Sequence, residues 1–327
     1  MFRFLIKVKF MSNKIKNLKI FITGGAGFIG SNLVKRLIKN NRVTVYDNFS
    51  GGKIEFLLPV LKEKNLKIIK GDILDFPKLN KTLKGHDLVI HLASNPDIAK
   101  GFDDPSIDVK QGILTTFNVL NAMRLNNVKK IIYTSGSGVY GDQEEIFIKE
   151  NYGPLIPVSM YGASKLSAEA LISAFCHLYE MQGWILRPAN IVGENQTHGV
   201  VYDFIKKLQK NPKELLILGD GKQKKCYLYV DDLINAMMVA FLKSHQTVNI
   251  FNVASKSFST VNEIAKIVID EMSLENVKFK YTGGRIGWKG DVPQIKLDVN
   301  KLTRLGWRPK FKSNDAVRQA VKDLLCK

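Results

Sequence analysis

The sequence predicts an α/β fold, with a doubly wound parallel sheet followed by a smaller α/β unit toward the C-terminus. Three observations lead to this prediction. Short apolar runs alternate with amphipathic stretches through the first half of the chain. The runs are almost continuously apolar, as strands buried on both faces are. After Arg187 the alternation becomes irregular, and helical patches at 199–210, 231–243 and 260–272 are separated by Gly- and Pro-containing turns.

The individual elements follow from the same patterns. The expected strands are LKIFITGG, RVTVYDN, LKIIKGD, HDLVIHLAS and VKKIIYTSG, with helices over SNLVKRLIKN and over 107–127. We predict a nucleotide-binding domain over 18–190, to which 226–252 returns as a strand and a helix. We assign 191–225 and 253–327 to a substrate-binding domain.

Composition restricts the classes of function. The net charge is +19, but the lysines are spread along the chain, which favours an anionic small substrate over nucleic acid. The three cysteines include no Cys-x-x-Cys pair, which argues against a metal site or a disulfide framework. No apolar run is long enough to span a bilayer, and the start lacks a signal-peptide pattern, so a cytoplasmic protein without membrane attachment is expected. Met11 is an alternative start that would leave residues 1–10 outside the native protein; a frayed extension is the other interpretation.

A glycine-rich segment, TGGAGFIGS, joins the first predicted strand to the first helix. Gly24, Gly27 and Gly30 permit a tight turn, close approach of backbone N–H groups to a pyrophosphate, and close helix–strand packing. Asp47 closes the second strand, where a carboxylate accepts hydrogen bonds from adenosine ribose hydroxyls and repels a 2′-phosphate. The segment therefore predicts NAD rather than NADP. Asp72, after the third strand, either faces the adenine or caps a helix at the surface.

Two Tyr-x-x-x-Lys pairs occur, Tyr161 with Lys165 and Tyr202 with Lys206. On a helix, residues four apart share a face. We choose the first pair because its helix follows a sheet strand and a polar loop, whereas Tyr202 falls on the substrate side. An ammonium near a phenol, with a cationic nicotinamide beside both, is expected to lower the pKa of Tyr161 from about 10 toward operating pH, so that it removes a proton from a sugar hydroxyl.

The motifs TGGAGFIG, VYDNFS, GDILD, HLAS, YGASK and RPANIVG occur in that order. With them the chain resembles, from Lys19 to Pro309, the extended short-chain dehydrogenase/reductase superfamily. The resemblance is strongest to its nucleotide-sugar epimerase/dehydratase branch, near UDP-glucose 4-epimerases. It implies a Rossmann domain with bound NAD, a C-terminal domain that grips a nucleotide-diphosphate sugar (a UDP-hexose), and a homodimer formed through two helices per subunit. The implied reaction is 4-epimerisation through a transient 4-keto sugar and enzyme-bound NADH.

The resemblance also implies roles for individual positions. Lys165 would hold the nicotinamide ribose. The other implied contacts are Gly24, Gly27, Phe28 and Ile29 for the pyrophosphate, Asp47 and Asn48 for the adenosine ribose, Asp72 and Ile73 for the adenine, Leu92 and Ala93 near the cofactor, and Asn190 for the substrate diphosphate.

The chain departs from the family pattern at four positions. Gly136 replaces the catalytic Ser or Thr, and Gly112 replaces an asparagine in the helix after the fourth strand. Lys225 replaces a phosphate-facing arginine and stays cationic without a bidentate fork. Trp288 replaces a second arginine, for which Arg285 or Lys289 compensates.

The hydroxyl missing at Gly136 has several possible substitutes. We predict Ser137 as the catalytic serine in preference to Ser135, because flanking glycines free the loop to turn. A water held by Thr134 or Ser135 is an alternative, and a loop without a catalytic serine is another. In 4,6-dehydratases the catalytic Thr is followed by Asp-Glu, the acid and base of water elimination; here these positions are Ser137 and Gly138. Epimerisation needs neither carboxylate.

Two other functions stay open. One is a related nucleotide-sugar reductase or dehydrogenase, which would show net turnover of NADH. The other is a catalytically silent NAD-binding protein, which Gly112 and Gly136 favour and which the retained Tyr161–Lys165 pair argues against.

Overall fold

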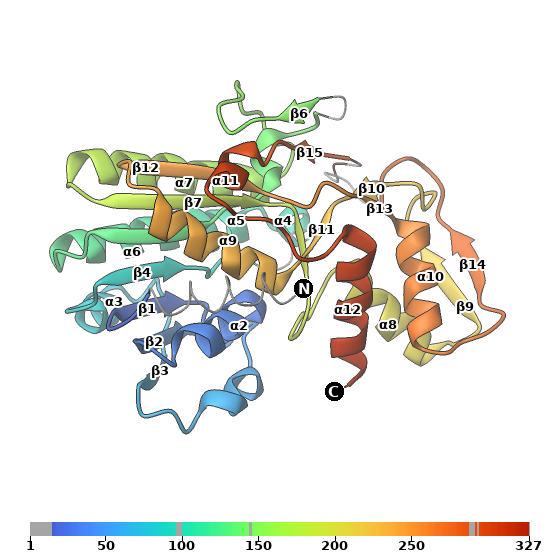
Figure 1. The fold of residues 1–327 in the computed structure, drawn as a ribbon, viewed down its shortest axis with the longest axis horizontal. Coiled ribbons are helices and arrows are strands. Elements are labelled where there is room, and N and C mark those ends of the chain that lie inside the picture. Colours follow the sequence, from blue (N-terminus) through green and yellow to red (C-terminus); the bar gives the residue numbers. More distant parts are fainter. Residues whose placement is uncertain (1–14, 96–99, 144–145, 288–291, 293, 327) are drawn as a thin grey trace.

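Seven parallel strands form the central sheet of this computed structural model, which describes residues 15–95, 100–143, 146–287, 292 and 294–326. The strand order is β12-β7-β5-β4-β1-β2-β3 (Figure 1). The strands are β1 (Lys19–Thr23), β2 (Arg42–Asp47), β3 (Leu66–Lys70), β4 (Leu88–His91), β5 (Lys130–Thr134), β7 (Gln182–Pro188) and β12 (Val248–Val253). From β1 the chain proceeds outward through β2 and β3, then returns to β4 on the other side. The predicted doubly wound sheet is confirmed, and its switch point lies between β1 and β4.

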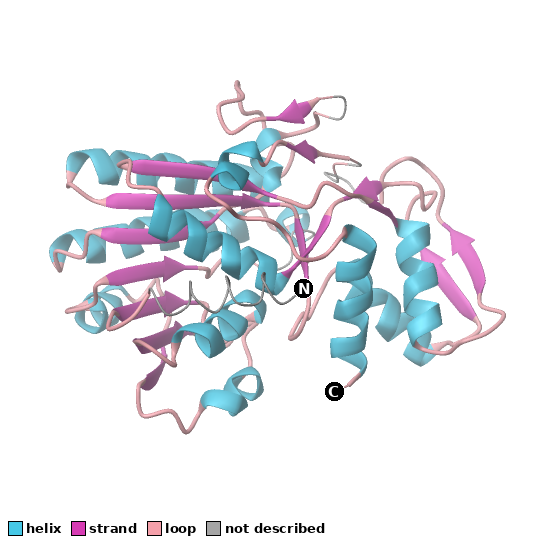
Figure 2. Ribbon diagram, in the orientation of Figure 1, coloured by secondary structure: helices cyan, strands magenta, loops and turns pink. Residues whose placement is uncertain are grey.

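Helices cover both faces of the sheet (Figure 2). The alternation along β1 shows why: Ile20 and Ile22 enter one core, and Phe21 enters the other. The first core also takes up side chains of α2 (Phe28–Leu37) and α9 (Val230–Lys243), and the second those of α3 (Phe76–Leu83), α6 (Thr115–Leu125) and α7 (Met160–Leu178). Burial on both faces accounts for the nearly continuous apolar strands in the sequence.

The edge strand β12 comes from late in the chain. It pairs in parallel with β7, with Val248 opposite Gly183. Residues 295–307, which the sequence analysis placed on the substrate side, also pack against the first core. Trp307 is buried there and its indole N–H donates to the carbonyl of Asp232 (3.0 Å).

A smaller unit lies beside the carboxyl ends of the sheet strands (Figure 1). It has its own core, built on three helices that pack together. They are α8 (Val200–Lys210), α10 (Val261–Glu271) and α12 (Ser313–Leu325). Its short strands are β8 (Asn190–Val192), β9 (Glu214–Ile217), β10 (Lys224–Lys225), β11 (Tyr227–Tyr229), β13 (Ser259–Thr260) and β14 (Lys278–Tyr281). The remaining elements are η1 (Ile54–Val60), α4 (Lys100–Asp103), η3 (Ser137–Tyr140), β6 (Phe147–Ile148), β15 (Lys296–Leu297) and α11 (Asn300–Arg304).

The helix expected over 107–127 is interrupted. It consists of α5 (Ser106–Asp108), a π-helical turn η2 (Val109–Leu114) and then α6. Gly112 lies in the π turn. Wide turns of this kind occur mostly as single interruptions of α-helices, often at functional sites. Sequence periodicity alone does not reveal such an interruption.

A buried ion pair joins α7 to β7. Arg187 donates to both carboxylate oxygens of Glu169, with an Nη2–Oε2 distance of 2.6 Å, and the two side chains are 3% and 5% exposed. Arg187 also donates to the hydroxyl of Tyr140 (2.8 Å), which in turn donates to Asn252 (2.7 Å). The network connects the loop after β5, helix α7 and strands β7 and β12.

Glu169→Ala is expected to lower the free energy of unfolding by about 3–5 kcal/mol, because it leaves the Arg187 charge buried without its partner. Urea unfolding followed by circular dichroism measures the change. The matched control is Glu214→Ala in the exposed pair with Lys280, which should cost about 0–1 kcal/mol. Equal effects of the two variants would contradict the assigned role of the buried pair.

Candidate active site

The predicted site lies at the carboxyl edge of the sheet. Parallel strands all end at this edge, so the loops after β1, β2, β4 and β5 converge there. Leu92 continues the bonding pattern past β4, since its N–H donates to the carbonyl of Thr23 (3.2 Å). The edge therefore brings together the glycine loop, Leu92–Ala93 and the 134–138 segment.

The glycine loop fits a pyrophosphate. Gly24 has a φ of +67°, and a Cβ there would lie 2.8 Å from the backbone nitrogen of Ala93. A Cβ on Gly30 would lie 2.1 Å from the carbonyl oxygen of Gly24, so no side chain fits where α2 meets the loop. Helix α2 has Gly27 as its N-cap and no side-chain cap. The first N–H groups of the helix, including those of the predicted residues Phe28 and Ile29, thus stay available to an anion.

Asp47 is fixed at the end of β2. Its Oδ2 accepts from the N–H of Ala26 in the glycine loop (2.9 Å), and its Oδ1 accepts from the N–H of Phe49 (2.8 Å). Burial raises the pKa of this carboxyl, and the two backbone hydrogen bonds oppose that rise. Each carboxylate oxygen retains a further lone pair, which can accept from a ribose hydroxyl.

The residues predicted for the adenine end differ in accessibility. Asn48 donates to the carboxylate of Asp72 (3.3 Å), and Asp72 is exposed. Ile73 is buried in the second core, and its carbonyl accepts from Asn118 (3.0 Å). Its side chain is therefore occupied in packing, and contact with a ligand there would involve backbone.

Tyr161 and Lys165 lie one turn apart at the start of α7. Ser159 caps this helix by accepting from the N–H of Gly162 (3.1 Å). Lys165 is 3% exposed, and its ammonium donates to the carbonyl of Thr134 (3.0 Å) and lies 5.4 Å from the centre of the Tyr161 ring. The structure thus joins the predicted catalytic pair to the end of β5.

The pKa values of the pair differ from the sequence expectation. Burial raises the pKa of Tyr161 to about 12, with a further upward contribution from the carboxylate of Asp108. Burial lowers the pKa of Lys165 to about 8, against the opposing effect of Asp108 and Glu169. The expected lowering of the tyrosine pKa, which also invoked a cationic nicotinamide, does not occur in the protein chain alone, because burial and the Asp108 carboxylate raise this pKa.

The second pair, Tyr202 and Lys206, lies in α8. This helix packs against α10 and α12 of the smaller unit. The Lys206 ammonium is 5.6 Å from the Tyr202 ring centre and donates to Gln209 (3.1 Å). These contacts place the pair in a helix of the smaller unit.

Gly136 faces Tyr161, the tyrosine predicted to be catalytic. A Cβ built on it would lie 3.9 Å from Cε1 of Tyr161, at ordinary van der Waals distance. Ser135 is buried and donates to Glu169 (2.5 Å). The Thr134 hydroxyl is buried and has no hydrogen-bond partner among the described residues. Ser137 opens the turn η3 and is partly exposed, and its catalytic role stays a prediction.

Gly112 has a packing explanation. A Cβ at this position would lie 2.6 Å from the Ser164 hydroxyl oxygen. That hydroxyl donates to the carbonyl of Tyr161 (2.8 Å). Ser164 thus occupies the space into which an asparagine at 112 would extend.

The predicted substrate residues come from two regions. Asn190 is exposed in β8, and its backbone N–H donates to the carbonyl of Cys226 (3.2 Å). Cys226 follows Lys225 directly in the chain. Asn190 and Lys225 are brought together in this way. Arg285 is exposed in the segment after β14. Trp288 and Lys289 lie outside the described residues.

Sequence reasoning missed three side chains close to the pair. The Ser94 hydroxyl hydrogen-bonds to Tyr161. Asp108 is buried; its Oδ1 accepts from Asn95 (3.1 Å), and its Oδ2 has no partner among the described residues. Glu169 had a detectable signal, because it follows Lys165 by four residues and so continues the same helix face.

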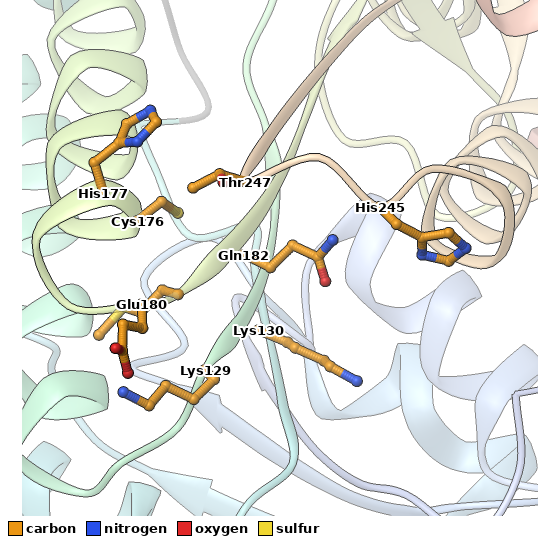
Figure 3. Close-up of a pocket in the computed structure, with 9 residues that line it drawn as sticks. Lys129, Lys130, Cys176, His177, Glu180, Gln182, His245 and Thr247 are labelled. Carbon is orange, nitrogen blue, oxygen red and sulfur yellow. The ribbon is translucent and has the colours of Figure 1, made fainter.

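A hollow of about 560 Å³ lies elsewhere, at the amino ends of β5, β7 and β12 (Figure 3). His177 and His245 lie on opposite sides of it (Figure 3). It contains none of the predicted site residues. Its lining consists of Lys129, Lys130, Cys176, His177, Glu180, Met181, Gln182, His245 and Thr247.

Two classes of feature are absent from the described residues. No group of three or more His, Cys, Asp or Glu side chains is placed to hold a metal ion in the described ranges. Within the same ranges no helix has the length and apolarity needed to cross a bilayer.

The fold and site define a nucleotide-binding enzyme of the Tyr-x-x-x-Lys dehydrogenase type. The chain belongs to the NAD dependent epimerase/dehydratase family, whose sequence profile matches residues 20–254. Its cofactor is NAD, and the family acts on nucleotide sugars.

Comparison with individual proteins leaves the reaction type open. A putative UDP-glucose 4-epimerase of Methanocaldococcus jannaschii is 33% identical over 92% of this chain and 97% of its own. A UDP-N-acetylglucosamine 4-epimerase structure from Methanobrevibacter ruminantium is 31% identical, with a TM-score of 0.86 over 95% of this chain and 99% of its own. A dTDP-glucose 4,6-dehydratase structure from Streptomyces venezuelae, with NAD bound, is 25% identical. Its TM-score is 0.88 over 95% of this chain and 98% of its own.

Asp47→Ala is expected to reduce the NAD that copurifies with the protein, because the variant loses both a ribose acceptor and the bond that holds the glycine loop at Ala26. Denaturation followed by chromatography of the released nucleotide measures the content. Asp315→Ala, at an exposed helix start, is the control and should retain wild-type content. Unchanged content in Asp47→Ala would contradict the assigned role.

Proposed function

We propose that this protein is a nucleotide-sugar 4-epimerase of the UDP-glucose/UDP-galactose type. The observation that carries the proposal is the buried Tyr161–Lys165 pair beside a loop that lacks carboxylates at 137 and 138. Water elimination needs a proton donor and acceptor at those loop positions, and the pattern of related decarboxylases has a Glu that this loop also lacks. Epimerisation needs neither carboxylate, because the base and the cofactor carry the proton and the hydride.

In the proposed reaction Tyr161 removes the proton from the 4-hydroxyl of the sugar. The glycine loop and Asp47 would hold NAD, which would supply the acceptor and then the donor of the hydride at carbon 4. Lys165 is fixed by the carbonyl of Thr134, and its positive charge favours the phenolate of Tyr161. Tyr161 then returns the proton to the 4-oxygen, so the protein ends each cycle unchanged.

We further propose that Asn190, Lys225 and Arg285 bind the substrate diphosphate. Asn190 and Lys225 lie near each other through the backbone bond to Cys226, and two of the three residues are cationic. An ammonium and a guanidinium both suit phosphate oxygens, the second in a bidentate manner.

The test of the proposed function is incubation of the purified protein with a panel of UDP-hexoses, with the sugar products followed by NMR. Interconversion at carbon 4 without net NADH supports the proposal. Net turnover of NADH identifies a reductase or dehydrogenase, a 4-keto-6-deoxy product identifies a dehydratase, and NAD binding without any product identifies a silent protein.

Tyr161→Phe should lower turnover by about 10² or more while NAD stays bound, which is the usual scale for loss of a general acid/base. Initial rates and bound nucleotide are measured on the same preparation. Tyr202→Phe, in the second pair, should leave turnover near the wild-type value. The reverse result would transfer the catalytic role to Tyr202.

We propose a cytoplasmic homodimer that pairs α6 and α7 of each subunit. These helices carry exposed apolar side chains, including Phe117, Leu125 and Leu178, which are 44%, 51% and 71% exposed. The Phe117 and Phe175 rings lie 6.1 Å apart, so apolar side chains of the two helices pack against each other. Contiguous apolar surface of this kind marks protein interfaces.

Phe117→Glu is expected to produce a monomer, because it places a charge within the proposed apolar interface. Light scattering coupled to size-exclusion chromatography gives the molar mass. Leu216→Glu, at a similarly exposed apolar position in β9, should stay dimeric. A monomeric wild type, or a dimeric Phe117→Glu variant, would refute this interface.

A further inference from the structure

We propose that Ser94, at the end of β4, supplies beside Tyr161 the hydroxyl that is missing at Gly136, and that it donates a hydrogen bond at the reacting oxygens. The proposal rests on the proposed function for its catalytic consequence. The contact between Ser94 and Tyr161 can be tested independently of that function.

The strand register places Ser94 level with Gly136. Strands β4 and β5 are parallel neighbours, and their last paired residues are His91 and Tyr133. Three residues beyond each of these come Ser94 and Gly136. The two positions therefore leave the sheet side by side.

Both positions approach the same side chain. A Cβ on Gly136 would lie 3.9 Å from Cε1 of Tyr161, the ring carbon next to the one that bears the hydroxyl. The Ser94 side chain, three residues beyond β4, lies within hydrogen-bonding reach of the Tyr161 hydroxyl and lowers the pKa of that phenol. Because Gly136 has no side chain, no group from residue 136 competes with Ser94 for the Tyr161 hydroxyl.

The other hydroxyls of the 134–137 segment lack this contact. Ser135 is committed to Glu169 (2.5 Å) and is 2% exposed. The Thr134 hydroxyl is buried without a partner among the described residues, and the Thr134 carbonyl accepts from Lys165. The Ser137 hydroxyl makes no hydrogen bond that the described part of the chain shows. Among these serines, Ser94 is therefore the one whose hydroxyl bonds to the Tyr161 side chain.

The role assigned to Ser94 needs no net proton transfer through the serine. One proton moves between the 4-hydroxyl of the sugar and the phenolate of Tyr161, while the Ser94 O–H stays intact and donates. A preorganised donor of this kind stabilises the charge on whichever oxygen is anionic. It also favours the phenolate over the phenol, because the hydrogen bond is stronger to the charged form.

The first experiment measures turnover in Ser94→Ala, Ser137→Ala and the double variant Ser94→Ala/Gly136→Ser. Ser94→Ala should lower kcat by about 10-fold to 10³-fold, the scale for one preorganised donor, with a small change in KM. The double variant should recover turnover, since a serine at 136 restores a hydroxyl beside the ring. Ser167→Ala is the control on α7, the helix that carries Tyr161. The Ser167 hydroxyl donates to the carbonyl of Ala163 (2.9 Å). Full turnover in Ser94→Ala overturns the catalytic role, and a loss confined to Ser137→Ala assigns it to Ser137.

The second experiment is independent of epimerase activity. The protein with bound NAD is labelled with tyrosine carrying ¹³C at the hydroxyl-bearing carbon, and Tyr161→Phe identifies the signal. The pKa of Tyr161 should rise in Ser94→Ala and return toward the wild-type value in the double variant. An unchanged pKa in Ser94→Ala overturns the contact even if the protein is an epimerase. A rise in a protein without epimerase activity retains the contact and refutes only the proposed function.

Discussion

The buried pair of Glu169 and Arg187 is the interaction on which the geometry of the site depends. Glu169 lies on the helix face that also carries Tyr161 and Lys165, so fixing its carboxylate fixes the rotation of α7 about its axis. Arg187 holds that carboxylate from β7, and Ser135 holds it from the end of β5. Two charges removed from water cost free energy that only good geometry offsets. That geometry also sets the position of Lys165 under the carbonyl of Thr134.

Gly112 and Gly136, the two glycines near the site, each lie beside a serine from another element. At Gly112 the space of a side chain is taken by Ser164, whose hydroxyl bonds to the backbone of Tyr161. At Gly136 the side chain is missing next to the ring of Tyr161, while Ser94 reaches the tyrosine from β4. In both places a small residue on one element is matched by a serine on another. Close packing of interiors makes such paired changes more tolerable than either change alone.

Much of the fold and part of the site could be predicted from the sequence. The glycine loop, Asp47 and the Tyr161–Lys165 pair each lie within one strand–turn or helical segment, where local spacing determines the geometry. Side chains that meet across strands could not be predicted in the same way. The approach of Ser94 to Tyr161 depends on the register of β4 against β5, which no local pattern encodes.

The energetic expectation for the pair needed the structure as well. Spacing predicted that Lys165 and Tyr161 are near each other, and they are. Spacing carries no information on the depth of burial or on the nearby carboxylate of Asp108, which together set the direction of the tyrosine pKa. The π turn within 107–127 was hidden for a similar reason, since one wide turn barely alters an apolar pattern.

The path of the chain between the central sheet and the smaller unit has a mechanical consequence. The chain leaves the sheet after β7, returns at α9, leaves again after β12, comes back at β15 and departs once more toward α12. Neither part is a continuous piece of sequence, so a single cut cannot release an intact half. Any movement of one part relative to the other must bend all of these connections together, which favours a stiff hinge of small amplitude over a freely swinging lid.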